Sequence, residues 1–132
     1  ILSEFYTIVI DEPSSEFDNL VLEDASLRET YTPDLTGYSK LLKDNLAATI
    51  KNGKFSKFED TKINGNQAKL MTVNGTVDGI DVFYQFGFVK GKDTYYQIVN
   101  WTELKRKEDH ADAMAKIISS FKEINRTKKK VN

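Results

Sequence analysis

The sequence contains no cysteine, only two prolines and a single histidine in 132 residues. The absence of cysteine excludes disulfide bonds, thiol catalysis and zinc–thiolate sites. No apolar run approaches the roughly 20 residues that a membrane-spanning helix needs. The remaining composition is that of an ordinary globular protein, with 39% hydrophobic and 30% charged residues. We therefore expect one domain that folds around its own core.

The two ends of the chain set the expected limits of this domain. Residues 125–132 are polar and basic and are expected to form a frayed tail after a single domain at residues 1–124. The chain begins with Ile1 rather than methionine. This start indicates that an upstream segment was removed, either a signal segment that ended in a lipid-anchoring cysteine or a part excluded by a cloning decision.

Charge is distributed unevenly along the chain, although the net charge is only −1. Residues 1–36 hold nine acids and one base, whereas the rest holds eighteen bases and eleven acids. Such asymmetry is typical of an acidic docking edge for a basic partner or cation, unless the opposite charges meet in the fold and cancel. Nucleic-acid binding is not expected, because it usually needs a basic face and a matching motif.

The N-terminal half changes from an alternating pattern to a helical one. Residues 4–13 alternate β-branched and aromatic residues and predict a strand. Residues 14–19 are interpreted as a polar connection and residues 20–33 as further strand material. Residues 34–51 predict an amphipathic helix, capped by Asp34 or Thr36 and ended by Asn52-Gly53. Its apolar stripe comprises Leu35, Tyr38, Leu42, Leu46 and Ile50.

Three turn signals, at Asn64-Gly65, Asp78-Gly79 and Lys90-Gly91, divide the next segment. They predict an antiparallel meander of four strands, because residues with positive φ are needed in tight hairpin turns. The predicted strands cover residues 57–63, 68–77, 80–89 and 94–101.

Turn positions also predict the register of the meander. If Val77 pairs with Ile80, then Met71 opposes Phe86; if Lys90 pairs with Asp93, then Phe88 opposes Tyr95. This register gathers an almost wholly apolar face, since strand side chains alternate between faces. The second face is mixed, so we expect a helix or the N-terminal strands to cover it in part, or a recessed surface used for contact. It contains Leu70, Thr72, Asn74, Phe83, Gln85, Tyr96, Ile98 and Asn100.

Residues 108–121 predict a closing helix, with Met114, Ile117, Ile118 and Phe121 on one stripe. The single histidine, His110, lies in its first turn, where acidic neighbours could make it a proton relay; a lone histidine at such a position is more often a partly exposed helix residue. The acids around it are badly spaced for a metal. No phosphate-binding glycine loop occurs, so no cofactor is expected. Paired carboxylates, the remaining catalytic alternative, have no motif of their own.

The aromatic stretch at residues 95–101 belongs mostly to the predicted core. Tyr95 and Trp101 lie on the apolar face. Tyr96, Phe83 and Asn100 lie on the mixed face and are the candidate surface for a partner or ligand.

The order of these elements, with INGNQA at residues 63–68, an aromatic strand before Trp101-Thr102 and SFK at residues 120–122, resembles the PsbP-like family over residues 5–124. The resemblance implies an α+β fold, in which a twisted antiparallel sheet carries helices on both faces as an α/β/α sandwich. It also implies a non-catalytic binding or accessory role. Relatives include an extrinsic photosystem II subunit, a Ran-binding nuclear factor, envelope lipoproteins and chaperone-like proteins that hold secreted toxins.

Three functions follow as hypotheses. The first is an extracytoplasmic, lipoprotein-derived domain that binds a protein or small ligand and touches the membrane only through an upstream lipid anchor. The second is a cytosolic protein-binding adaptor or chaperone of the same fold. The third is a small hydrolase that works with paired carboxylates.

Overall fold

The computed structural model describes residues 4–124, which form an α+β fold around one six-stranded antiparallel sheet. The predicted tail at residues 125–132 lies outside the described residues. The strands are β1 (Tyr6–Pro13), β2 (Lys51–Phe55), β3 (Glu59–Ile63), β4 (Asn66–Val77), β5 (Ile80–Lys90) and β6 (Thr94–Glu103). The helices are α1 (Ser14–Glu23), α2 (Ala25–Arg28), α3 (Leu35–Thr49), the 3₁₀ turn η1 (Leu104–Arg106) and α4 (Lys107–Ser119).

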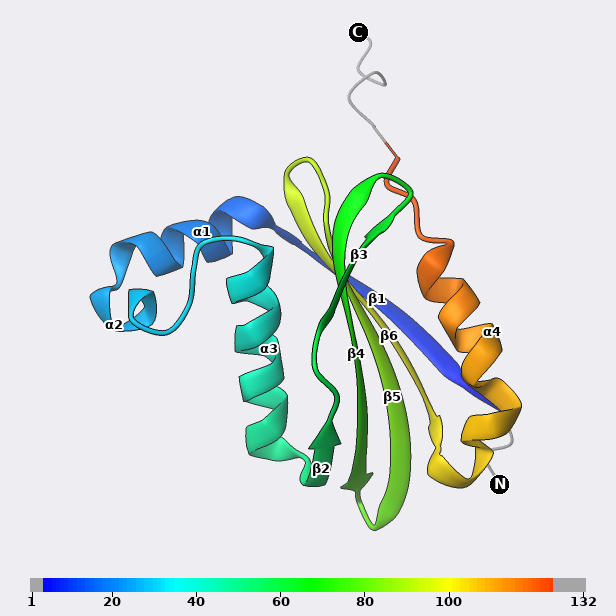
Figure 1. Cartoon of the computed structure of the whole chain (residues 1–132). Coiled ribbons are helices and arrows are strands. Elements are labelled where there is room, and N and C mark those ends of the chain that lie inside the picture. The colour runs from blue at the N-terminus through cyan, green and yellow to red at the C-terminus, as the bar shows by residue number, and fades with distance from the viewer. Residues whose placement is uncertain (1–3, 125–132) are drawn as a thin grey trace, which may run out of the picture.

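The sheet is twisted, and helices cover both of its faces (Figure 1). Its strand order is β1-β6-β5-β4-β2, and β3 also pairs with β4 beyond the end of β2. Helix α3 lies on one side and α4 on the other, while α1 and α2 project away from the body (Figure 1). The predicted fold class is therefore confirmed.

Two of the three predicted turns have the expected geometry. Asn64-Gly65 and Asp78-Gly79 all have positive φ, between 49° and 87°. Val77 pairs with Ile80 across the second turn, as predicted.

The prediction at Lys90 was wrong, because this connection is longer than a two-residue turn. Lys90 pairs with Tyr95 rather than with Asp93, so Phe88 opposes Gln97. The backbone N–H of Gly91 donates to the Thr94 carbonyl at 2.8 Å and closes the loop. A shift of two residues leaves every side chain on its predicted face.

Another error concerns residues 14–33, which form helices and not a connection followed by a strand. Phe17 and Val21 are one helical turn apart, and both are buried. The predicted segments 14–19 and 20–33 separated Phe17 from Val21, so the four-residue spacing typical of a helix was not recognised. The Asp24 carboxylate accepts from the Ser26 and Leu27 N–H groups and starts α2.

Helix α3 agrees closely with its prediction. The Asp34 side chain caps it by accepting from the Gly37 N–H at 3.0 Å. The helix ends at Thr49, two residues before the predicted end, and Asn52 adopts positive φ in the missed strand β2.

Each face of the sheet carries its own core. On the first face, α1 and α3 bury the predicted apolar residues; this core comprises Phe17, Val21, Leu35, Tyr38, Met71, Val73, Phe86, Phe88, Tyr95 and Val99. On the second face, α4 and the segment after it bury a smaller cluster of Ile63, Ala68, Val89, Ile98 and Ile118. The mixed face is thus covered by a helix, but only in part.

Candidate functional site

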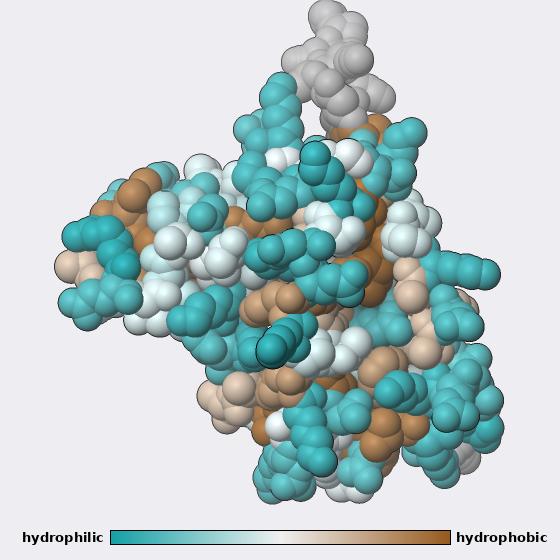
Figure 2. All heavy atoms as spheres, in the orientation of Figure 1, coloured by the Kyte–Doolittle hydropathy of each residue, from teal (hydrophilic) through white to brown (hydrophobic). Residues whose placement is uncertain are grey.

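A groove lies between α4 and strands β3, β4 and β5, and we call it the α4 groove. Its volume is about 480 Å³, within the range of small-molecule and peptide sites. Apolar side chains lie between the β3–β4 hairpin and α4, with hydrophilic residues around them (Figure 2). The lining comprises Ile63, Leu70, Met71, Phe86 and Ile118 with Ser56, Lys57, Glu59, Thr61, Lys62, Thr72, Gln85, Ala115 and Ser119.

The groove exists because α4 covers only part of the second face. Helix α4 packs against β5 and β6. The helix packs closely on the sheet at Gly87, where an added Cβ atom would lie 2.6 Å from Ile118 Cγ2. The second face of β4 at Leu70 and Thr72 extends beyond the helix, and small residues such as Ala115 line the opposite wall. A recessed strip of mixed polarity results.

Gln85 supplies the specific polar group of this groove. Its Nε2 donates to the Ala111 carbonyl of α4 at 3.1 Å, which fixes the orientation of the amide. Its Oε1 is buried and accepts no hydrogen bond from the described residues. A buried acceptor without a partner costs about 1–3 kcal/mol. This oxygen has almost no exposed surface, so an occupant of the groove would satisfy it only after the side chains around it move.

The rim carries charges of both signs. Lys57, Glu59 and Lys62 line the groove and are exposed to solvent. Within residues 4–124, no group of three or more His, Asp or Glu side chains is placed to hold a metal ion. The apolar and polar residues that line the groove suit binding by apolar contact and hydrogen bonding. The hydrolase hypothesis stays a prediction.

The three residues predicted as a contact surface share the face of the groove but lie elsewhere on it. Phe83 is only 3% exposed, and Lys107 Nζ lies 4.8 Å from its ring centroid. Asn100 is fully buried, and its Nδ2 donates to the Met114 carbonyl at 2.7 Å. Tyr96 is partly buried, and its hydroxyl donates to Glu123 at 2.6 Å. Phe83 and Asn100 thus hold the sheet and α4 together rather than face a partner.

Several tyrosines are held protonated by their surroundings. Burial and the hydrogen bond to Glu123 raise the pKa of Tyr96 to about 12. Burial also raises the pKa of Tyr95 and Tyr38, which donate to Asp18 and Glu12 respectively. The three hydroxyls act as donors: Tyr38 ties α3 to β1, Tyr95 ties β6 to α1, and Tyr96 ties β6 to the segment after α4.

Three other residues considered in the sequence, His110, Tyr95 and Trp101, pack against neighbouring side chains. His110 lies in α4, and its ring centroid is 5.3 Å from that of Phe5. Tyr95 is buried in the first core, and Trp101 stacks on Tyr6 at 5.7 Å. Sequence reasoning missed the groove, although Gln85 is a signal that could have pointed to it, as a polar residue between Tyr84 and Phe86 in a mostly apolar strand.

Comparisons with known proteins bear on the fold. No family model matches the chain, and no curated protein matches it. Among solved structures, it is similar to the protein of unknown function PA94 from Pseudomonas aeruginosa, described as a candidate regulator. The TM-score is 0.69 at 15% sequence identity, and the match covers 92% of this chain and 74% of that one. At this identity the likeness shows a shared fold alone. No helix among residues 4–124 is long and apolar enough to cross a membrane.

Proposed function

We propose that this chain is a non-catalytic binding domain that takes an apolar peptide segment of a partner protein in the α4 groove. One observation carries the proposal: a groove of about 480 Å³ with an apolar floor and a polar rim is lined by Gln85, whose buried Oε1 has no donor among the described residues. Apolar surface gives such a site affinity, and a few placed polar groups give it specificity.

The unpaired acceptor also favours a peptide over a lipid. Every residue of a peptide except proline carries a backbone N–H, which could donate to Gln85 Oε1 where binding moves the side chains that cover this oxygen. A fatty acyl chain has no donor along its length and would leave this oxygen unsatisfied. The mixed charges of Lys57, Glu59 and Lys62 on the rim are compatible with the polar residues that flank an apolar peptide segment.

We further infer an accessory role outside the cytoplasm, as part of a lipoprotein-derived envelope protein. The support is the PsbP-like resemblance, and membrane contact would then run only through an upstream lipid anchor. The alternative is a cytosolic adaptor or chaperone with the same groove. The native upstream sequence separates the two, because a hydrophobic signal that ends in a lipobox-like cysteine is incompatible with the cytosolic version.

A pair of tryptophan variants on α4 tests the groove. Ala115 lines the groove, whereas Ala113 is an exposed alanine of the same helix that does not line it. A library of random peptides displayed on phage is selected against the wild-type chain. The affinity of an enriched peptide is then measured for wild type, Ala115→Trp and Ala113→Trp by fluorescence anisotropy, and the fold is checked by circular dichroism.

The proposal predicts that Ala115→Trp weakens peptide binding by at least about tenfold, as removal of a central contact does, while Ala113→Trp leaves it unchanged. Equal binding by both variants, or failure to enrich any peptide, would contradict it. If a fluorescent fatty acid binds and only Ala115→Trp blocks it, the groove is a binding site but its ligand is an acyl chain and not a peptide.

A further inference from the structure

Strand β1 is an edge strand with an unusually apolar surface. Among the described residues it pairs with β6 alone, through eight consecutive pairs from Tyr6–Trp101 to Pro13–Thr94. Three consecutive aliphatic residues, Ile8, Val9 and Ile10, are exposed, and Val9 is 52% exposed. Because neighbouring side chains alternate in direction, apolar surface is exposed on both faces of this edge.

Strand β1 lacks most of the usual protections of an edge strand, and its charged residues, Asp11 and Glu12, lie only toward its C-terminal end. It contains no lysine or arginine, and its single proline is its last residue. Its register with β6 runs without a bulge. The strand is also held firmly, since Thr7 Oγ1 donates to Asn100 Oδ1 at 2.5 Å. An apolar, regular edge of this kind is a template for pairing with another strand.

We propose that β1 pairs antiparallel with β1 of a second copy of this chain, which joins two sheets across a two-fold axis at Val9. The register is argued from charge, because both acids of β1 lie toward its C-terminal end and antiparallel pairing separates them from their copies. A parallel pair would set each acid beside its own copy. The opposed residues are Val9 with Val9, Ile8 with Ile10, Thr7 with Asp11 and Tyr6 with Glu12.

Neighbouring antiparallel registers are less favourable. In an antiparallel pair, directly opposed residues place their side chains on the same face of the sheet. The two-fold axis must therefore pass through a residue, and the alternative registers have their axis at Ile8 or Ile10. An axis at Ile8 sets Glu4 opposite Glu12, and like charges directly opposite destabilise a pair. An axis at Ile10 sets Glu12 opposite Ile8. Only the register with its axis at Val9 pairs the three aliphatic residues with one another and sets no acid opposite another acid or an aliphatic residue.

This pairing is independent of the α4 groove. The strand order places β1 at one edge of the sheet, whereas the groove is lined from β3, β4 and β5 toward the other. Two groove-bearing domains would therefore be joined with both grooves open. The dimer adds bivalency to the proposed binding function without requiring it.

Disulfide cross-linking tests the register. Because the sequence has no cysteine, any disulfide that forms must join the introduced cysteines. Opposed residues of antiparallel strands have Cα atoms about 4.5–5.5 Å apart, which a disulfide can span. Val9→Cys is expected to form a covalent dimer on mild oxidation. Leu20→Cys is the matched control, since Leu20 in α1 is also 52% exposed. A mixture of Ile8→Cys and Ile10→Cys is expected to give the mixed dimer.

The oligomeric state tests the pairing itself. In sedimentation velocity, the wild-type chain is expected to be a dimer, with twice the chain mass of 15.1 kDa. Val9→Lys is expected to be a monomer, and the control Leu20→Lys is expected to remain a dimer. A wild-type chain that stays monomeric at high concentration would overturn the proposal and leave the edge to a strand of another protein. Equal cross-linking of Val9→Cys and Leu20→Cys would also overturn it. The cross-linking arm keeps the test decisive if Val9→Lys fails to fold.

Discussion

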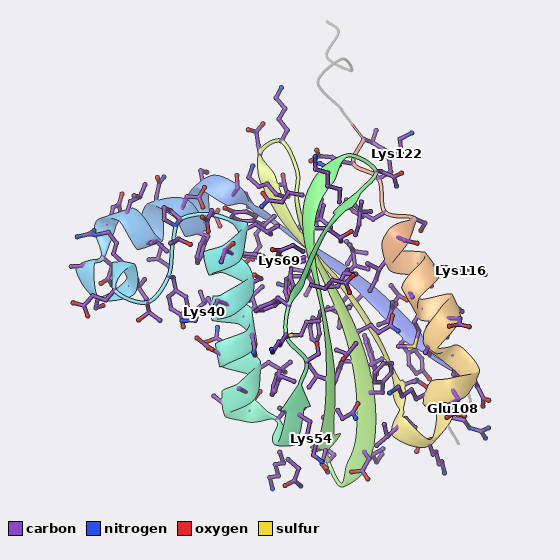
Figure 3. The ribbon with its side chains drawn as sticks, in the orientation of Figure 1. Lys40, Lys54, Lys69, Glu108, Lys116 and Lys122 are labelled. Carbon is purple, nitrogen blue, oxygen red and sulfur yellow. The ribbon has the colours of Figure 1, made fainter. Side chains whose placement is uncertain are left out.

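Two polar side chains beneath the surface differ in whether they have a partner. Lys69 is only 8% exposed, and its Nζ lies 2.5 Å from Asp60 Oδ1; Figure 3 shows it next to β3. Gln85 has one satisfied group and one unsatisfied oxygen. A paired charge of this kind serves the fold, whereas an unsatisfied acceptor in a groove is retained at a cost to stability.

Replacing Gln85 by methionine should therefore separate stability from binding. Gln85→Met keeps the side-chain volume, removes the unsatisfied oxygen and loses the hydrogen bond to the Ala111 carbonyl. The two effects oppose each other, so the free energy of unfolding is expected to change by less than about 1 kcal/mol. Peptide affinity is expected to fall by about tenfold, because the acceptor is gone. Urea denaturation and anisotropy measure the two quantities. A loss of stability with unchanged affinity would show that Gln85 has only a structural role.

The Lys69–Asp60 pair predicts an asymmetry between its two partners. Lys69→Met replaces a buried charge by an apolar chain and should change the free energy of unfolding by less than about 1 kcal/mol. Asp60→Asn leaves the ammonium without its counter-charge and should cost about 1–2 kcal/mol, less than for a fully buried pair because Asp60 is exposed. Urea denaturation of both variants checks this; a larger loss for Lys69→Met would contradict it.

Tyr96 predicts a loss of stability at alkaline pH. Its pKa of about 12 in the folded chain exceeds the ordinary value of 10.0, so its contribution is fully present below pH 10 and is lost as the pH rises toward 12. Tyr96→Phe should lower stability at neutral pH by about 1 kcal/mol through loss of the Glu123 hydrogen bond. It should also show a smaller further loss above pH 10, in denaturation curves recorded across this range. An unchanged alkaline slope would argue against this role.

Among the elements, α4 determines where the groove lies, and Gly87 determines how closely α4 approaches. Gly87→Ala should destabilise the protein by about 1–3 kcal/mol, because its Cβ would lie 2.6 Å from Ile118 Cγ2. Leucine lacks this branch methyl, so adding Ile118→Leu should restore part of the lost stability. A double-mutant cycle by urea denaturation measures the coupling. Strict additivity of the two changes would place the clash elsewhere.

The elements also show how far the sequence predicts the structure. Helix α3 and the Asp78-Gly79 hairpin were predictable because one period or one turn dipeptide dominates each. Helix α1 was missed because its buried pair, Phe17 and Val21, is short and flanked by polar residues. The mixed face predicted partial cover by another element or a recessed surface, but not where on the face a recess would lie. Its limits depend on how far α4 extends over β4, which side-chain packing decides and local sequence does not.

On the scale of the whole molecule, the charge asymmetry of the sequence persists in the fold. Within residues 4–124, the two ion pairs are Lys69–Asp60 and Arg106–Asp109, and neither uses an acid of residues 4–36. Basic residues are spread over separate elements, as Lys40 on α3 and Lys116 on α4 show in Figure 3. Direct ion pairs within residues 4–124 therefore do not cancel the asymmetry, and an acidic docking edge in residues 1–36 stays a prediction.

The most direct test of the central claim, that the α4 groove binds a partner protein, is photo-cross-linking in cells of the chain's own source. A benzophenone amino acid is introduced at Ala115, which lines the groove, or at Ala113, which does not. We predict one dominant cross-linked partner from position 115 that is absent from position 113 and is reduced by Gln85→Met. Equal products from both positions, or none from position 115, would contradict the account.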